Sequence, residues 1–258
     1  MDSKADLRNA FQERLLAAIY KARQPGELIL KGGGAMKVRT DSARFTQDID
    51  LDHDPRRGLD SLVKSIRKAI DQAFVGGFKK LQVTEPKQTD TVARWKIHGQ
   101  GPKGEDFQLT VEVSRRHAIN QEEIETALLQ IRDRSFSSRV YIDIYRADKL
   151  AEMKLYALLD DNRIAPRDIY DLDLLIGEGA APSGEAMANL QAKYGDVSGQ
   201  LIKKLAAMPW PLFESQTLSV IPDALRLRIN EVEYAAMQER ILNEVMKWTA
   251  QPARSPGP

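Results

Sequence analysis

The chain has 258 residues, and its 38 lysines and arginines nearly balance its 37 aspartates and glutamates, for a formal net charge of +1. It contains no cysteine, which excludes thiol nucleophiles, cysteine-ligated zinc, iron–sulfur clusters and disulfides. The small net charge exerts no general attraction on nucleic acid, so any such partner must be bound by a local basic patch. No apolar run approaches the ~18 residues of a membrane span, and the N-terminus lacks the apolar region of a signal peptide. We therefore expect a cytoplasmic protein that has no membrane partner.

In chain order, helices and strands alternate over residues 1–146. Apolar residues at helical spacing predict helices over 6–23, 35–39 and 57–74. Period-two alternation and short apolar runs predict strands over 27–31, 48–54, 78–84, 91–98, 107–114 and 140–145. The Gly/Pro-rich segment 101–104 joins two of these strands and is typical of a hairpin.

The rest of the chain is predicted to be almost entirely helical, from a helix over 147–159 to a last helix over 223–249. The expected fold class is therefore α/β (α+β). A mixed sheet with helices occupies 1–146, and a helical domain that completes the active site follows over 147–250. Residues 251–258 are predicted to be a disordered tail.

The strand predicted at 48–54 carries alternating carboxylates. Asp48 and Asp50 project from one face about 7 Å apart, and two like charges on a half-buried strand repel each other. A cation between them removes this cost, and carboxylate oxygens suit Mg²⁺ that holds substrate phosphates. A solvated edge strand with acidic residues is the alternative.

Three consecutive glycines, Gly32, Gly33 and Gly34, separate a predicted strand from a short helix. Bare backbone N–H groups at the start of a helix form an anion site. The glycines precede Asp48 by sixteen residues, which leaves room for one helix and a return to the neighbouring strand. A phosphate-binding turn beside a metal-binding pair is what nucleotidyl transfer requires. A flexible turn is the alternative.

A third carboxylate would complete such a metal site, and Glu112 is the candidate. It lies in the strand predicted at 107–114, flanked by β-branched residues. A cross-strand ion pair of Glu112 with Arg94 or Arg115 is the alternative, and for an isolated strand glutamate it is the more frequent arrangement.

The region that contains the glycines and the acidic strand resembles the signature of polymerase-β-type nucleotidyltransferases, and more narrowly that of AbiEii-type nucleotidyltransferase toxins. Members carry a strand, Gly-Gly, a helix with an Arg, and an R-x-S-x-D-I-D-L segment. The corresponding residues here are LKGGGAMKVRTDSARFTQDIDLD, at 30–52. Thr46 stands where the family usually has Ser, so the hydroxyl is retained.

A second block, over 140–175, resembles the family's helix with Glu-Lys-Leu-x-Ala-Leu and its Arg-Asp-x-x-Asp-Leu helix. Lys154 aligns with the family's catalytic lysine, although Met153 replaces the usual Glu. The residues at 167–172, RDIYDL, match the last motif. No motif is recognised in the C-terminal third.

The resemblance implies a role for each matched residue. The implied metal ligands are Asp48, Asp50 and Glu112, which together with Lys154 and Asp171 form the expected catalytic set. The implied nucleotide-binding residues are Gly32, Gly33, Gly34, Arg44, Thr46, Arg167 and Asp168. Plainer alternatives exist: an exposed helix lysine for Lys154, a strand-initiating residue for Thr46, and an acid that favours a helix N-terminus for Asp168.

The function implied by the resemblance is a nucleotidyltransferase that uses Mg²⁺ or Mn²⁺. It would move NMP from an NTP to an acceptor hydroxyl, in this family the 3′ end of tRNA, and release pyrophosphate. The protein would be the toxin of a toxin–antitoxin or phage-abortive system, with a cognate antitoxin as partner. Two alternatives stay open: a protein or small-molecule acceptor, and a nucleotide-binding regulatory protein without transfer activity. The two repelling carboxylates argue against the latter.

Overall fold

The computed structural model describes residues 4–40, 44–75, 77–131 and 139–250. They form two compact units. One contains residues 4–40 and the described part of 45–145, and the other contains residue 44 and residues 146–250. The tail predicted at 251–258 lies outside the described residues. No helix in the described ranges is long and apolar enough to span a membrane.

The first unit is built on a mixed sheet that has seven strands within the described residues, in the order β3-β4-β5-β2-β1-β7-β6. Parallel pairs join β2 to β5 and β1 to β7, and the other neighbours are antiparallel. The elements are α1 (Lys4–Lys21), β1 (Leu28–Lys31), α2 (Gly32–Arg39), β2 (Asp48–His53), α3 (Leu59–Ala73), β3 (Lys79–Gln88), β4 (Val92–Gln100), β5 (Asp106–Ser114), β6 (Ile124–Leu129) and β7 (Val140–Tyr145), with a 3₁₀ turn at Gln121–Glu123.

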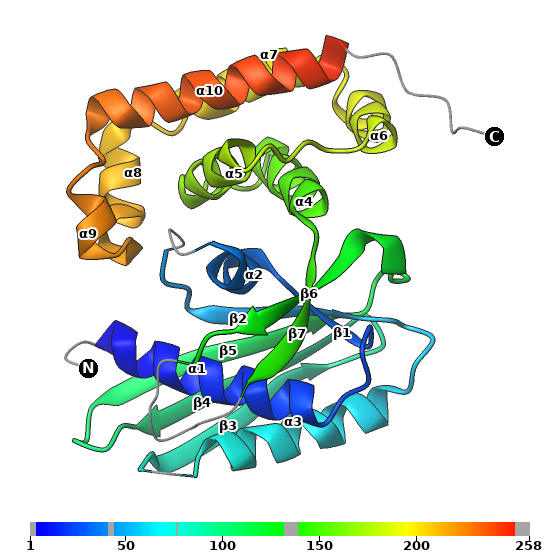
Figure 1. Cartoon of the computed structure of the whole chain (residues 1–258), viewed down its shortest axis with the longest axis vertical. Coiled ribbons are helices and arrows are strands. Elements are labelled where there is room, and N and C mark those ends of the chain that lie inside the picture. The colour runs from blue at the N-terminus through cyan, green and yellow to red at the C-terminus, as the bar shows by residue number, and fades with distance from the viewer. Residues whose placement is uncertain (1–3, 41–43, 76, 132–138, 251–258) are drawn as a thin grey trace. The chain divides into compact units, whose positions relative to one another are not determined.

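Helices α1 and α3 pack together along one face of this sheet, and α2 lies on the other side of β1 and β2 (Figure 1). The core under α1 is aromatic. Phe11 contacts the rings of Phe74, Phe78 and Phe107 at centroid separations of 4.8–6.3 Å. Such aromatic contacts fix the angle at which α1 crosses the sheet, because each ring must fit between its neighbours.

The burial of β2 alternates as its sequence predicts. Ile49 and Leu51 are buried, whereas Asp48 is exposed and Asp50 is half-buried. The parallel pairing of β2 with β5 sets Asp48 opposite Thr110 and Asp50 opposite Glu112. One face of these two strands therefore faces the core, and the other presents the carboxylates.

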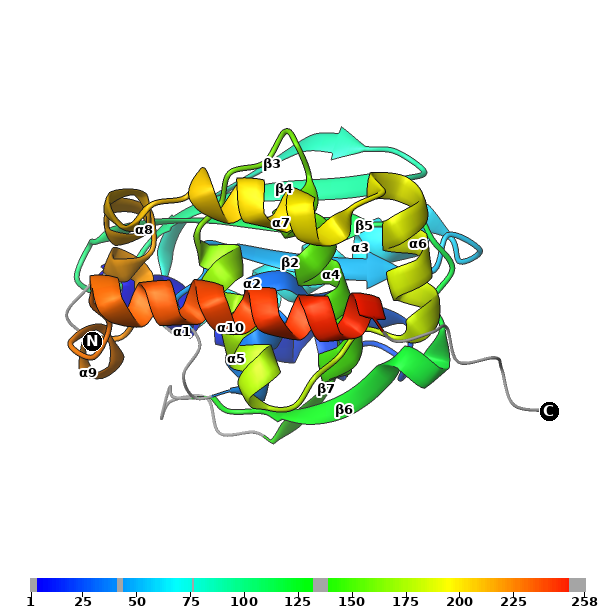
Figure 2. The same cartoon turned by 90° about the horizontal axis from the view of Figure 1, so that it is seen from above.

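The second unit is helical. Its long last helix, α10, lies across α5 and beside α7 (Figure 2). Trp210, Phe213 and Tyr234 stack at one end, and the Tyr234 hydroxyl donates to the carbonyl oxygen of Met208 at 2.7 Å. The elements are α4 (Ala147–Leu159), α5 (Arg167–Gly177), α6 (Gly184–Tyr194), α7 (Val197–Ala206), α8 (Trp210–Gln216), a 3₁₀ turn at Leu218–Val220, α9 (Asp223–Arg226) and α10 (Glu231–Ala250).

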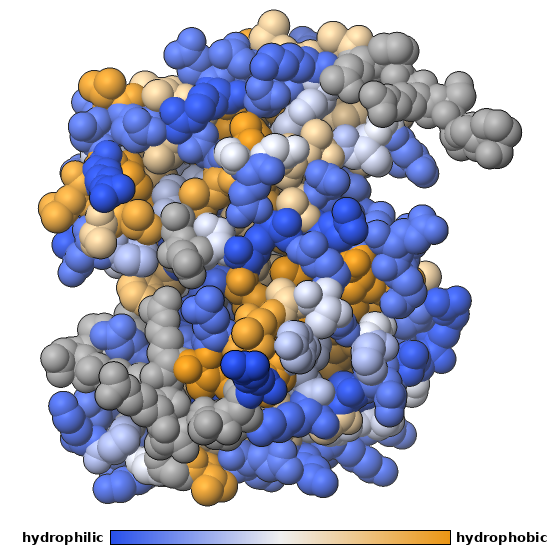
Figure 3. All heavy atoms as spheres, in the orientation of Figure 1, coloured by the Kyte–Doolittle hydropathy of each residue, from blue (hydrophilic) through white to orange (hydrophobic). Residues whose placement is uncertain are grey.

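The face shown in Figure 3 is mostly hydrophilic, and apolar side chains are visible in the region of α8 and α9 and at places in the sheet unit. Leu227, which directly follows α9, is 86% exposed, and Val232, within α10, is 78% exposed. They contribute almost nothing to the core of the helical unit.

The predicted fold class, a mixed sheet followed by helices, is confirmed. Three details differ. Strand β6 was not predicted. The expected helix at 35–39 begins earlier, at Gly32. The expected last helix is interrupted, because Asn230 accepts a hydrogen bond from the Glu233 N–H at 2.9 Å and so starts α10 anew.

His53, at the end of β2, is a buried histidine that lies beside an arginine. It is 1% exposed, and its Nδ1 accepts a hydrogen bond from Arg115 Nε at 3.2 Å. Burial lowers the pKa of His53 to about 4, and the positive charges of Arg115, Arg23 and Arg57 act in the same direction against the weaker effect of Glu27.

This lowered pKa predicts a loss of stability in acid. The unfolded chain takes up the proton near pH 6.5 and the folded chain only near pH 4, so the free energy of unfolding falls as pH decreases between these values. His53→Gln, which keeps an acceptor for Arg115, is expected to remove up to about 3 kcal/mol of this dependence. Urea unfolding at pH 7 and pH 4.5 measures it. His98→Gln, at an exposed position of β4, is the control, and equal pH dependence in both variants would contradict the prediction.

Candidate active site

The junction of β1 and α2 brings glycine backbone close to a carboxylate. Gly32 has φ +62°, a conformation that residues with a side chain rarely adopt. A Cβ atom on Gly32 would lie 2.7 Å from Oδ2 of Asp50. This position therefore requires glycine for two reasons, the backbone conformation and the space that the Asp50 carboxylate occupies.

The glycines form the first turn of α2 and are not a turn that precedes it. Within the described part of the chain, no side chain caps this helix at Lys31. The first N–H groups of a helix have no partner within the helix, so those of Gly32, Gly33 and Gly34 remain available as donors. Gly33 and Gly34 are buried. Such a helix start binds anions through its N–H groups and its dipole.

Asp52 differs from Asp48 and Asp50, although all three lie on one face of β2. Asp52 accepts hydrogen bonds from Lys31 Nζ at 2.5 Å and from the Tyr145 hydroxyl at 2.8 Å. Burial and the nearby Asp52 raise the pKa of Tyr145, which keeps that hydroxyl neutral and able to donate. Asp52 is therefore committed to structural contacts.

Glu112 forms the cross-strand pair that sequence analysis gave as the alternative. It lies opposite Asp50 in the register, but its carboxylate accepts hydrogen bonds from Arg94 Nε at 2.8 Å and from Arg94 Nη2. Within the described ranges, no group of three or more acidic, histidine or cysteine side chains is arranged to hold a metal ion. The structure thus does not assemble the expected set of Asp48, Asp50 and Glu112. The pair Asp48 and Asp50, with the space left by Gly32, is the donor set that fits a divalent cation.

Helix α1 contributes polar groups that sequence analysis missed. Gln12 Nε2 donates to the carbonyl oxygen of Thr46 at 3.1 Å, and Lys37 of α2 donates to Glu13 Oε1 at 3.1 Å. Burial lowers the pKa of Arg8, and the Asp48 carboxylate acts in the opposite direction, so this guanidinium lies within the field of Asp48. The helix was predicted from the spacing of its apolar residues. The polar residues lie between them in the sequence and were assigned no role.

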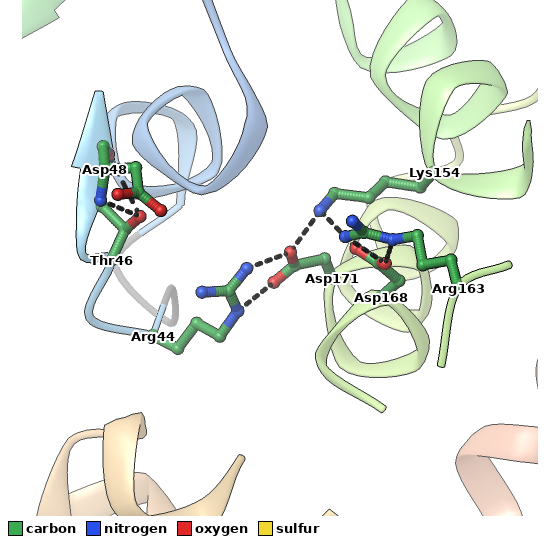
Figure 4. A network of polar contacts seen from close by, with 7 residues as sticks. All are labelled: Arg44, Thr46, Asp48, Lys154, Arg163, Asp168 and Asp171. Carbon is green, nitrogen blue, oxygen red and sulfur yellow. Dashed lines mark hydrogen bonds and ion pairs between the residues drawn. The ribbon is translucent and has the colours of Figure 1, made fainter. Parts of the chain in front are cut away.

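A pocket lies in the first unit, next to α1, α2 and the start of β2. Its walls come from α1, α2, the start of β2 and the end of β6, and they include Gln12, Gly34, Lys37, Thr46 and Asp48. The Thr46 hydroxyl donates to the Asp48 carbonyl oxygen at 3.2 Å and accepts from the Asp48 N–H at 3.4 Å (Figure 4). Thr46 therefore fixes the start of β2, which is the plainer of its two expected roles.

The second unit contains a buried ionic network, here called the lysine centre: Lys154, Asp168, Asp171, Arg44 and Arg163. Lys154 Nζ, from α4, donates to Asp168 Oδ1 at 2.9 Å and to Asp171 Oδ2 at 2.6 Å, both on α5 (Figure 4). Arg44 binds Asp171 through two hydrogen bonds of 3.2 and 2.9 Å, and Arg163 Nε donates to Asp168 at 2.8 Å. The side chains of Lys154, Asp168 and Asp171 are 9%, 1% and 0% exposed.

The network keeps Lys154 and Asp168 ionised. Burial by itself would lower the pKa of Lys154, but Asp171 and Asp168 together raise it above its ordinary value. Burial would raise the pKa of Asp168, and the charges of Lys154 and Arg163 outweigh that effect and lower it. Lys154 is therefore a fixed ammonium that cannot act as a base at neutral pH. The alternative of an exposed helix lysine is wrong for Lys154.

Arg167 is separate from this network. It begins α5 and is exposed, and its side chain makes no hydrogen bond or ion pair with any residue in the described ranges. In the motif at 167–172, Asp168 and Asp171 are therefore buried and ion-paired, whereas Arg167 is exposed and has no side-chain partner among the described residues.

Comparisons with known proteins identify a family and similar folds for this chain. The model of a family described as nucleotidyl transferase AbiEii toxin, type IV TA system, matches residues 14–254. The crystal structure of JHP933 from Helicobacter pylori is 19% identical, covers 96% of this chain and 94% of that chain, and has a TM-score of 0.63. MenT4, a nucleotidyltransferase toxin from Mycobacterium tuberculosis, is 17% identical, covers 97% of this chain and 85% of that chain, and has a TM-score of 0.60. At such identities the likeness shows the fold alone. No curated protein matches the chain.

The contact between Gly32 and Asp50 predicts a specific effect of Gly32→Ala. The added methyl group strains the backbone by about 1–2 kcal/mol and displaces the Asp50 carboxylate. We expect the affinity for Mn²⁺, measured by titration calorimetry, to fall at least tenfold. Gly104→Ala is the matched control, because Gly104 also has a positive φ, +90°, but its Cβ would contact nothing within 4 Å. Equal Mn²⁺ affinities in the two variants would contradict the role of Gly32.

The lysine centre predicts a large stability difference between two lysines of α4. Lys154→Met leaves buried carboxylates without a cation and is expected to cost about 3–5 kcal/mol in free energy of unfolding. Lys149→Met removes a partly exposed pair with Glu152 at 2.9 Å and is expected to cost less than about 1 kcal/mol. Urea unfolding of the two variants at pH 7 provides the comparison, and similar costs would show that the centre is not an ionic network.

Proposed function

Because this chain belongs to the AbiEii family of nucleotidyltransferase toxins of type IV toxin–antitoxin systems, we propose that it transfers NMP from an NTP to the 3′ end of tRNA. The family implies an NTP substrate and a cognate antitoxin. The tRNA acceptor, the use of Mg²⁺ or Mn²⁺ and the site of action in the cytoplasm are parts of the proposal. Extension of the tRNA end would stop translation, as a toxin or a phage-abortive protein requires.

One observation carries the proposal: the Asp48 and Asp50 pair lies beside the uncapped start of α2, with Asp50 against Gly32. The carboxylates are the ligands that a divalent cation prefers, and the N–H groups of the glycine turn can bind phosphate oxygens. A binding protein without transfer activity would gain nothing from two repelling carboxylates. This juxtaposition therefore favours phosphoryl chemistry over simple nucleotide binding.

In the proposed reaction, the terminal hydroxyl oxygen of the acceptor attacks the α-phosphorus of the NTP. The new oxygen–phosphorus bond forms, the bond to the bridging oxygen breaks, and pyrophosphate leaves while the hydroxyl proton passes to solvent. Asp48 and Asp50 would hold the cation, which when bound neutralises phosphate charge and lowers the pKa of the attacking hydroxyl. Glu112 is bound to Arg94, so its carboxylate is not free to deprotonate the hydroxyl unless that pair opens.

The lysine centre would supply fixed positive charge. Its three cations exceed its two carboxylates, so it carries a net positive charge that can stabilise phosphate oxygens. Asp171 is fully buried and both its oxygens are bound, so we assign it, with Asp168, the role of a positioning residue for Lys154 and Arg44. Preorganised charge of this kind needs no rearrangement during the reaction.

The proposal predicts a clear difference between two aspartates of β2. With labelled NTPs, Mg²⁺ and total tRNA, wild-type protein should label tRNA, and Asp50→Asn should reduce labelling at least a hundredfold by weakening cation binding. Asp52→Asn is the control, since Asp52 is occupied by Lys31 at Oδ1 and by Tyr145 at Oδ2 and the amide oxygen can still accept from one of them, and it should keep most of the activity.

Three outcomes would contradict the proposal: label on protein alone, no label on any acceptor, or an Asp50→Asn variant as active as wild type. In cells, expression of the wild-type chain should arrest growth, and Asp48→Ala and Lys154→Ala should relieve that arrest.

A further inference from the structure

We propose that a pocket in the second unit, between the α4–α5 loop and the end of α8, binds a backbone phosphate of the RNA acceptor. This inference rests on the proposed transfer to RNA and adds the place where the acceptor is held. The pocket has a volume of about 270 Å³, and its walls include Asn162, Arg163, Arg167, Gln216 and Thr217.

The walls of this pocket offer hydrogen-bond donors and positive charge. None of the residues that line it is acidic. The side chains of Arg167 and Gln216 have no partner in the described part of the chain, and the buried hydroxyl of Thr217 has none either. The Arg167 guanidinium beside amide donors suits a phosphate, because hydrogen bonds between ionised partners are about twice as strong as neutral ones. Arg163 adds to the positive charge only in part, since it is bound to Asp168.

The pocket walls are held in place by contacts outside the pocket. Lys204 of α7 donates to the carbonyl oxygen of Arg163 at 3.1 Å and to that of Asp160, which fixes the α4–α5 loop. The Thr217 N–H donates to the Phe213 carbonyl oxygen at 2.8 Å, and Phe213 belongs to the aromatic stack of α8. A preformed site loses little conformational entropy when it binds a ligand.

The pocket adjoins the lysine centre through one carboxylate. Asp168 binds Lys154 with Oδ1 at 2.9 Å and binds Arg163, a pocket residue, with Oδ2 at 2.7 Å. An RNA strand whose phosphate occupies the pocket would therefore lie next to the helix pair that carries Lys154. The motif arginine, Arg167, stands on the same α5 as Asp168 and would contact that phosphate.

Size favours a backbone phosphate over the NTP. Pockets for whole small molecules typically measure about 300–1,000 Å³. At about 270 Å³ this pocket accommodates a phosphate with part of its sugar more readily than a complete nucleoside triphosphate. Binding of the NTP at this position is the competing outcome, and the experiment separates the two.

The test measures RNA binding without turnover. Fluorescently labelled, deacylated tRNA is titrated with full-length Asp50→Asn protein by anisotropy, in the absence of NTP, at 50–200 mM KCl. Adding Arg167→Ala should weaken binding about tenfold and reduce the slope of log K against log salt by about 0.7–0.9, the loss of one phosphate contact. Adding Gln216→Ala should weaken binding two- to fivefold without changing the slope, because it removes a donor and no charge.

Lys203→Ala is the matched control, since Lys203 is exposed on α7 and does not line the pocket. It should leave affinity within twofold of the parent. Equal effects of Lys203→Ala and Arg167→Ala, unchanged binding in the Arg167→Ala and Gln216→Ala variants, or no tRNA binding at all would overturn the pocket assignment. If Arg167→Ala in the otherwise wild-type enzyme raises the KM for NTP and leaves the RNA affinity unchanged, the pocket binds the nucleotide. That result would also overturn the pocket assignment.

These outcomes are separable from failure of the proposed function. If wild-type protein labels tRNA but Arg167→Ala binds tRNA normally, the reaction stands and the pocket assignment is wrong. If tRNA binding depends on Arg167 and Gln216 but wild-type protein transfers nothing to tRNA, the pocket assignment stands and the proposed reaction is wrong.

Discussion

The helical unit depends on keeping the Lys154 ammonium charged after its removal from water. Burial of a single charge costs several kcal/mol. Two carboxylates on one side of α5 offset this cost for Lys154 only if the carboxylate oxygens that Lys154 does not bind also have partners. Arg44 and Arg163 provide those bonds to Asp171 and Asp168. The need to satisfy one ammonium thus fixes the spacing of α4 and α5, the conformation of the loop between them and the position of residue 44. A charge held in a dry environment interacts more strongly with phosphate than one in water, which is what the proposed function would require of Lys154.

In the sheet unit the charges that must be balanced are negative, and they lie at the surface. Asp52 is neutralised within the protein by Lys31, and Glu112 by Arg94, so that both contribute to the stability of the folded unit. Asp48 and Asp50 are arranged differently: the first is exposed, and the second faces a glycine whose missing side chain leaves room at the carboxylate. The pairing of Asp52 does not follow the register directly, because Lys31 lies opposite Asp50 and reaches diagonally across β1 and β2 to Asp52, whereas Arg94 pairs with Glu112 directly opposite it.

Sequence predicts local geometry better than it predicts pairing. The alternation of β2 and the helix that begins at Arg167 follow from periodicity and from residues that start or end helices, so these elements were predictable. The start of α2 was not, because three glycines were expected to precede the helix and instead form its first turn. The partner of Glu112 was not, because Arg94 and Arg115 both lie within reach in sequence and only the register of β4 with β5 decides between them. The burial of Lys154 was equally hidden, since helical spacing places it on a face but does not reveal what covers that face.

The near-neutral composition hides a separation of charge that only the tertiary structure makes. Within the sheet unit, the start of β2 carries Asp48 and Asp50, the carboxylates proposed to hold a cation. Within the helical unit, the lysine centre has one more cation than anions, and Arg167 adds an uncommitted positive charge beside it. A polyanionic substrate responds to such local potentials and not to the sum over the chain. Because the surplus cations stand at fixed positions, each can act on a particular phosphate, which suits recognition of one RNA end better than a uniformly basic surface, whose attraction is independent of sequence and position.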